Sequence, residues 1–218
     1  MRLARATAVF AAIAASSSGL AQLDQSGAGG SIAGIVLDSE YLIFVVDTSG
    51  SMKQFAWDDV AEHIRDTLAA YPALKGVQVV NDEGYYLLDR AQGEWLPYTP
   101  ALEAEILAAL PEWAAFSNSQ PHEGIIKAIE TFYDPGKRIS LYVYSDDFAN
   151  GVVESTVAAV DRANRVGTTG DRKVRINAVA FPAIYEATSQ LYSAAAYAVL
   201  MRELCQRNGG SFIALAVR

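Results

Sequence analysis

Three mostly apolar runs of strand length constrain the fold more than any other feature of the sequence. They cover residues 41–46, 139–144 and 174–181. A strand of this kind is typical of a parallel sheet that is buried under helices on both faces. Segments with apolar residues at helical spacing separate the runs, at residues 58–68, 102–110, 124–132 and 155–163. The alternation predicts an α/β fold, Rossmann-like and doubly wound, with a mostly parallel central sheet and helices on both faces.

Two further patterns complete the predicted sheet. Residues 77–80 and 85–88 flank the turn sequence Asn81-Asp82-Glu83-Gly84, which predicts a hairpin and therefore one antiparallel strand at an edge. A helix predicted at 197–206 is followed by Asn208-Gly209-Gly210, a typical helix end, and then by a last short strand at 211–216.

The first part of the chain has the pattern of a cleaved secretory signal. Arg2 and Arg5 flank the start of an apolar run at 6–15, and Gly19 and Ala21 occupy the −3 and −1 positions of a cut before Gln22. The apolar run is too short to span a bilayer, which needs about 20 residues. We therefore predict a signal peptide at 1–21, a flexible lead-in rich in Gly and Ser at 22–38, and one domain at 39–218. The mature chain is expected to be secreted or periplasmic and not inserted in a membrane.

Composition excludes several classes of function. Hydrophobic residues make up 51% of the 218 residues, which favours a globular core over disorder. The net charge of −8 is opposite to that of a general nucleic-acid binder. Cys205 is the single cysteine, so the chain has no internal disulfide and no multi-cysteine metal site.

Acidic residues follow two of the predicted parallel strands. Asp47 comes directly after the first run, and Asp146 closely follows the second. Ligands of such sheets bind at the carboxyl ends of the strands, so both acids are expected at the same end of the sheet. Asp47, Ser49 and Ser51 alternate along the first loop, and carboxylate and hydroxyl oxygens suit Mg²⁺, with Mn²⁺ or Ca²⁺ as alternatives. These oxygens are too few to hold an ion alone, so further ligands must come from elsewhere.

The segment Val45-Val46-Asp47-Thr48-Ser49-Gly50-Ser51-Met52 resembles the opening motif of von Willebrand factor type A domains. The resemblance extends over residues 39–217 and implies a metal-ion-dependent adhesion site built from three loops. It implies Asp47, Ser49 and Ser51 in the first loop. In the second loop the family's threonine matches Ser119, followed by Gly124 and Ile125 at the family's spacing; Gln120 and Ser117 remain alternative counterparts.

The third loop of the family ends in Thr-Asp-Gly, which corresponds here to Ser145-Asp146-Asp147. The resemblance therefore implies Asp146 as the fifth ligand, and Asp147 departs from the family's glycine. It further implies a protein-binding module without catalysis, in which a partner protein's carboxylate fills an open position on the ion. Asp147, Trp57 and His122 are candidates for contacts with that partner at the rim of the site.

Other interpretations of the same residues remain open. Ser49 and Ser51 are also suited to capping a helix, with Asp47 stabilising a turn. A structural subunit of an envelope assembly with a vestigial metal site is the main functional alternative. A metal-assisted hydrolase with Asp47 as nucleophile is the other. The sequence does not define the oligomeric state.

Overall fold

A computed structural model describes residues 30–32, 35–113, 116–149, 151–167, 169–181 and 188–215. The chain divides into two compact units, Met1–Asp38 and Ser39–Arg218. The predicted signal peptide at 1–21 lies outside the described residues. Within the predicted lead-in, strands β1 (Gly30–Ile32) and β2 (Ile35–Leu37) pair as a small antiparallel sheet, which the Gly- and Ser-rich composition did not predict.

The second unit is built on one six-stranded sheet with the order β5-β4-β3-β6-β7-β8. All neighbouring strands are parallel except β5, the antiparallel edge strand. The strands are β3 (Tyr41–Val46), β4 (Gly76–Asn81), β5 (Leu96–Pro97), β6 (Ile139–Ser145), β7 (Arg175–Ala180) and β8 (Phe212–Ala214).

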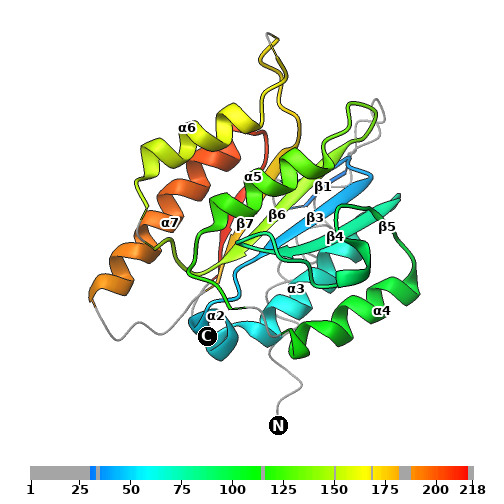
Figure 1. The fold of residues 1–218 in the computed structure, drawn as a ribbon, viewed down its shortest axis with the longest axis horizontal. Coiled ribbons are helices and arrows are strands. Elements are labelled where there is room, and N and C mark those ends of the chain that lie inside the picture. Colours follow the sequence, from blue (N-terminus) through cyan, green and yellow to red (C-terminus); the bar gives the residue numbers. More distant parts are fainter. Residues whose placement is uncertain are drawn as a thin grey trace, which may run out of the picture. The chain divides into compact units, whose positions relative to one another are not determined.

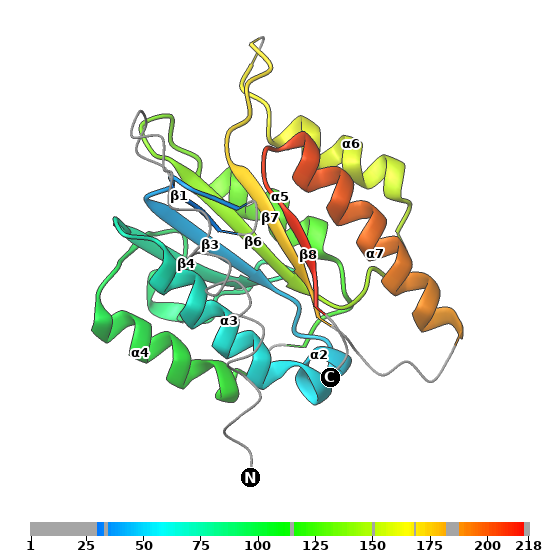
Figure 2. The ribbon, with the colours of Figure 1, turned by 180° about the vertical axis from the view of Figure 1, so that it is seen from behind.

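Helices cover both faces of this sheet. Helices α5, α6 and α7 lie on the face toward the viewer in Figure 1, and α3 and α4 are better seen from behind in Figure 2. The helices are α2 (Gly50–Phe55), α3 (Trp57–Ala70), α4 (Pro100–Ala109), α5 (Pro121–Phe132), α6 (Val153–Ala163) and α7 (Thr188–Arg207). Two short 3-10 turns are η2 (Asp89–Ala91) and η3 (Leu110–Glu112). The predicted fold class is therefore confirmed.

The central strands are apolar on both sides because each side packs on a helix layer. Ile43 and Val45 belong to the core that includes α5, α6 and α7. The ring of Phe44 contacts those of Tyr142 and Tyr144 on the other face. There the hydroxyl of Tyr144 is hydrogen-bonded to Thr67 of α3 at 2.9 Å. This double burial is the physical origin of the continuous apolar runs.

The register between β3 and β6 positions the functional region. Val46 pairs with Tyr144, and the amide of Asp47 donates to the carbonyl of Tyr144 at 2.8 Å. Both strands run in the same direction, so Asp47 after β3 and Asp146 after β6 leave the sheet at the same end, the carboxyl end of the strands.

The predicted hairpin strand at 85–88 is wrong in detail. Only an isolated bridge joins Tyr86 to Val80, and the paired edge strand is β5, further along the chain. The side-chain amide of Gln78 donates to the carbonyls of Ala91 and Glu94, which holds the intervening segment close to β4. Tertiary contacts of this kind leave no local sequence pattern.

The last helix begins at Thr188, earlier than the predicted residue 197, and ends at Arg207, one residue after the predicted end. Gly209 has a φ of 68°, and the amide of Gly210 donates to the carbonyl of Cys205 at 2.9 Å. This left-handed glycine closes the helix, as the Asn-Gly-Gly sequence indicated. Within the described ranges, no helix combines the length and apolar character needed to cross a membrane.

Candidate metal centre at the strand ends

The first loop places its three oxygen-bearing side chains together. Asp47 is completely buried; its Oδ1 accepts from the amide of Ser49 at 2.7 Å, and its Oδ2 accepts from the hydroxyl of Ser145 at 2.6 Å. The hydroxyls of Ser49 and Ser51 are 3.2 Å apart. Ser49 is the N-cap residue of α2, yet its side chain makes no capping hydrogen bond. Helix capping therefore does not account for this hydroxyl.

The third loop brings two more carboxylates to the same place. Asp146 is buried, and Asp147 is partly buried. Carboxylate oxygens of Asp47, Asp146 and Asp147 all lie within 4.8 Å of one another. The hydroxyl of Ser193 on α7 donates to Oδ2 of Asp147 at 3.1 Å, while Oδ1 of Asp147 is buried without a hydrogen-bond partner. The residue that replaces the family's glycine thus joins the oxygen cluster itself.

The second loop contributes Ser117 to the contacts with Asp47. The Ser117 hydroxyl donates to Oδ1 of Asp47 at 3.3 Å and accepts from the amide of Thr48 at 3.2 Å. Ser119 is buried with a φ of 54°, and its carbonyl accepts from the amide of Ala149. The hydroxyl of Ser117 is therefore hydrogen-bonded to the first loop, and both serines remain candidates for the ligand from the second loop.

Sequence reasoning missed Asp82 and Ser145. Asp82 follows β4 as Asp47 follows β3, and it is completely buried. The signal was present, since an acid stands just after an apolar strand, but the Asn-Asp-Glu-Gly sequence was assigned to a turn alone. Ser145 ends β6 and binds Asp47 directly. The clue in the sequence was its place as the first residue of Ser145-Asp146-Asp147, where the family has a threonine.

Burial makes ionised carboxylates unfavourable at this end of the sheet. Desolvation, followed by repulsion from Asp82, raises the pKa of Asp47. Desolvation also raises the pKa of Asp82. The pKa of Asp146 is raised to about 7 by desolvation and by the charge of Asp47, while a hydrogen bond from Ser51 opposes the rise. A divalent cation among these oxygens would offset both the desolvation of the carboxylates and the repulsion between them.

The three rim candidates occupy different surroundings. Trp57 donates from its indole N–H to the carbonyl of Leu110 at 2.9 Å and packs on Trp113, which ties the start of α3 to η3. The ring of His122 meets the edge of Phe148, and its buried Nδ1 has no hydrogen-bond partner. Burial lowers the pKa of His122. Asp147 belongs to the oxygen cluster described above.

One exposed aromatic residue beside the cluster was not predicted. Phe116 is 69% exposed, directly precedes Ser117, and has its ring 3.7 Å from where a Cβ on Gly50 would lie. It therefore stands over the first loop with most of its apolar surface in water.

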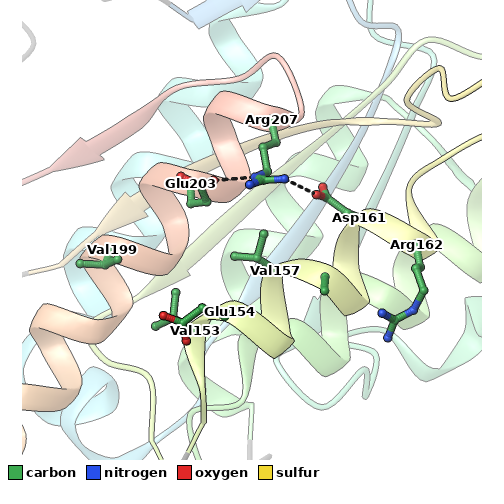
Figure 3. A pocket seen from close by; sticks show the side chains of 9 residues that line it. Val153, Glu154, Val157, Asp161, Arg162, Val199, Glu203 and Arg207 are labelled. Carbon is green, nitrogen blue, oxygen red and sulfur yellow. Dashed lines mark hydrogen bonds and ion pairs between the residues drawn. The ribbon is translucent and has the colours of Figure 1, made fainter.

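A separate groove lies between α6 and α7 (Figure 3) and has a volume of about 560 Å³. Val153, Val157 and Val199 form its apolar part, and Arg207 bridges Glu203 and Asp161 at one end. It shares no residue with the oxygen cluster.

Comparison with known proteins bears on the fold. No family model matches the sequence, and no curated protein matches it either. Among solved structures, a von Willebrand factor type A protein from Catenulispora acidiphila has a TM-score of 0.60 at 13% identity, covering 84% of this chain. The chain spans 40% of the length of that structure.

Two further solved structures have lower scores. The aerotolerance-related membrane protein from Bacteroides fragilis NCTC 9343 has a TM-score of 0.48 at 11% identity, covering 81% of this chain and 91% of its own. The SpRpn10 VWA domain has a TM-score of 0.48 at 13% identity, covering 81% and 88%. With the strand order, the antiparallel edge strand and the likeness to the Catenulispora protein, residues 39–215 have the fold of a von Willebrand factor type A domain.

Proposed function

We propose that this chain is an exported protein-binding module whose binding depends on a divalent cation. The observation that carries the proposal is the cluster of Asp47, Asp146 and Asp147, whose carboxylate oxygens approach within 4.8 Å at the carboxyl ends of β3 and β6. The predicted signal peptide supports export, and the fold supports an interaction module.

The residues present fit a hard cation. Asp47, Ser49, Ser51 and Asp146 would hold it, with a hydroxyl from the second loop supplied by Ser119 or Ser117. Carboxylate and hydroxyl oxygens favour Mg²⁺, with Mn²⁺ and Ca²⁺ as alternatives, over zinc. The raised pKa values of Asp47 and Asp146 support this assignment, because buried carboxylates without a cation are unfavourable.

The bound ion would supply a coordination position for an acidic side chain of a partner protein. Phe116 extends this binding surface with an apolar area beside the first loop. Aromatic residues, phenylalanine included, are enriched in the cores of protein interfaces. The partner therefore offers a carboxylate with an apolar group close to it.

The environment of Asp47 argues against the hydrolase alternative. Both of its carboxylate oxygens accept hydrogen bonds, and no part of the residue is exposed. A nucleophile must reach its substrate, so we propose that the protein is not an enzyme. A structural subunit with a vestigial site remains the competing function, and it predicts no response to metal.

Thermal unfolding with and without metal tests the proposal. Residues 22–218 are unfolded in chelator and in excess Mg²⁺ or Mn²⁺, as wild type, Asp47→Ala and Ser51→Ala. An ion at about 100 times its dissociation constant stabilises by roughly 2.7 kcal/mol. For a domain of this size the midpoint rises on the order of 5–10 °C. We expect this rise in the wild type, a smaller one in Ser51→Ala and none in Asp47→Ala.

Asp171→Asn is the matched control, because it removes one exposed carboxylate before β7, at the opposite end of the strands. It should keep the full metal response. A wild type whose midpoint does not move at millimolar Mg²⁺ or Mn²⁺ would refute the proposal and favour the structural subunit.

A further inference from the structure

Asp82 connects two of the chain segments that surround the oxygen cluster. Its amide donates to the carbonyl of Val46 at 3.1 Å, and its own carbonyl accepts from the amide of Gly124 at 2.7 Å. Its Oδ2 accepts from the amide of Gln120 at 2.9 Å, and its Oδ1 accepts from the amide of Thr48 at 3.4 Å. The loop after β3 and the loop before α5 are thus held on one carboxylate.

Ser117 links this carboxylate to Asp47. The Ser117 hydroxyl donates to Asp47 at 3.3 Å and accepts at 3.2 Å from the amide of Thr48, the same amide that lies 3.4 Å from Oδ1 of Asp82. The second loop is therefore placed by Asp82 and reaches the predicted ligand Asp47 through Ser117.

The charge of Asp82 has no counter-ion in the described part of the chain. Neither Asp47 nor Asp82 belongs to an ion pair there, although both are completely buried. Burying an unpaired charge is costly, and two neighbouring carboxylates repel each other. A neutral residue at position 82 would remove both of these costs, so the hydrogen bonds to the two loops do not by themselves explain a charged residue there.

We propose that Asp82 is a positioning residue of the cation site, which fixes the loops around the ion and lends the site a buried negative charge without ligating the ion. This inference rests on the proposed function. The Asp82 carboxylate then lowers the stability of the metal-free protein, and it raises the affinity of the protein for a divalent cation.

Asp82→Asn separates these effects from a structural role. The Asn oxygen still accepts from the amide of Gln120, and the substitution gives up only the long 3.4 Å hydrogen bond from the amide of Thr48, because an NH2 group cannot accept it. In chelator, we expect the variant to unfold at a higher temperature than the wild type. Its affinity for Mn²⁺, measured by calorimetry and by the spin-resonance signal of free Mn²⁺, should fall by about tenfold, as expected for losing one nearby charge.

Asp82→Ala provides a second variant that lacks the charge and the hydrogen bonds, and it should bind Mn²⁺ more weakly than Asp82→Asn. Asp171→Asn should match the wild type in both measurements. Wild-type Mn²⁺ affinity in Asp82→Asn, or a lower unfolding temperature in chelator, would overturn the inference. Failure of both Asp82 variants to fold would also overturn it. A wild type that binds no Mn²⁺ would refute the proposed function itself, which distinguishes the two failures.

Discussion

Phe116 is placed to add specificity to the proposed ion site. A bound ion alone would accept the carboxylate of any acidic partner. The aromatic ring beside Gly50 would favour a carboxylate that has an apolar group next to it. Burying a small apolar contact contributes about 1 kcal/mol, which is about fivefold in affinity.

We therefore expect 3-phenylpropionate to bind in Mg²⁺ about fivefold more tightly than acetate. Phe116→Ala should abolish this preference without changing Mg²⁺ affinity, and ligand-observed NMR titration measures both carboxylates. Tyr192→Ala removes another exposed aromatic residue, on α7, and should retain the preference. Equal binding of the two carboxylates by the wild type would contradict a role for Phe116.

At this scale the sequence predicted Asp47, Ser49, Ser51 and Asp146 as site residues because each follows an apolar strand in a recognisable motif, and the metal-ligating role of these residues stays a prediction. Asp82 had the same position after its strand, but a turn sequence explained it equally well. Ser117 and Ser119 could not be separated by spacing. The choice depends on the path of the loop, which includes a positive φ at Ser119 that only the packing of the folded domain enforces.

Helix α5 packs against the strand ends at its first turns. A Cβ on Gly124 would lie 2.6 Å from the carbonyl oxygen of Asn81 and 2.9 Å from the side chain of Val45. The amide of Gly124 also donates to Asp82. The glycine therefore permits the close approach that brings the second loop to the site.

Gly124→Ala should destabilise the domain by about 1–3 kcal/mol, because backbone atoms would have to move apart. Urea unfolding in chelator measures the loss. Gly50→Ala is the control, since its added Cβ would meet only the Phe116 ring at an ordinary 3.7 Å. A Gly124→Ala midpoint equal to that of Gly50→Ala would show that α5 has more freedom than the structure indicates.

Strands and helices could be predicted where the sequence shows one clear hydrophobic period. The central strands and the amphipathic helices α3, α5 and α6 were found because burial sets their periodicity. The two residues of β5 are too few to show a period, and a proline is one of them. The early start of α7 was missed because its first turns lack a clear apolar stripe.

The domain as a whole should respond to pH through its buried acids. Burial raises the pKa values of Asp47, Asp82 and Asp146, the last to about 7. An acid whose pKa is higher in the folded state favours folding when protonated. This contribution is complete below the ordinary value of about 4 and is lost as pH rises through the folded value.

In chelator, the unfolding temperature should therefore fall by several degrees between pH 5 and pH 8. Asp146→Asn should flatten this dependence, because its amide does not titrate. Excess Mg²⁺ should offset the loss most strongly at pH 8, where protons no longer compete for the oxygens. Differential scanning calorimetry across this pH range tests the sign, and a midpoint that rises with pH in chelator would contradict it.

The strand order also determines when the site can exist during synthesis. Strand β3 lies between β4 and β6, and Tyr41 pairs with both Gly76 and Ile139. A nascent chain that has left the ribosome only as far as β4 carries Asp47 and Asp82 but has neither Asp146 nor the strand that buries them. The proposed cation site is therefore complete only after residue 147 has emerged, and a chain that stops before residue 146 would lack two of the three clustered carboxylates.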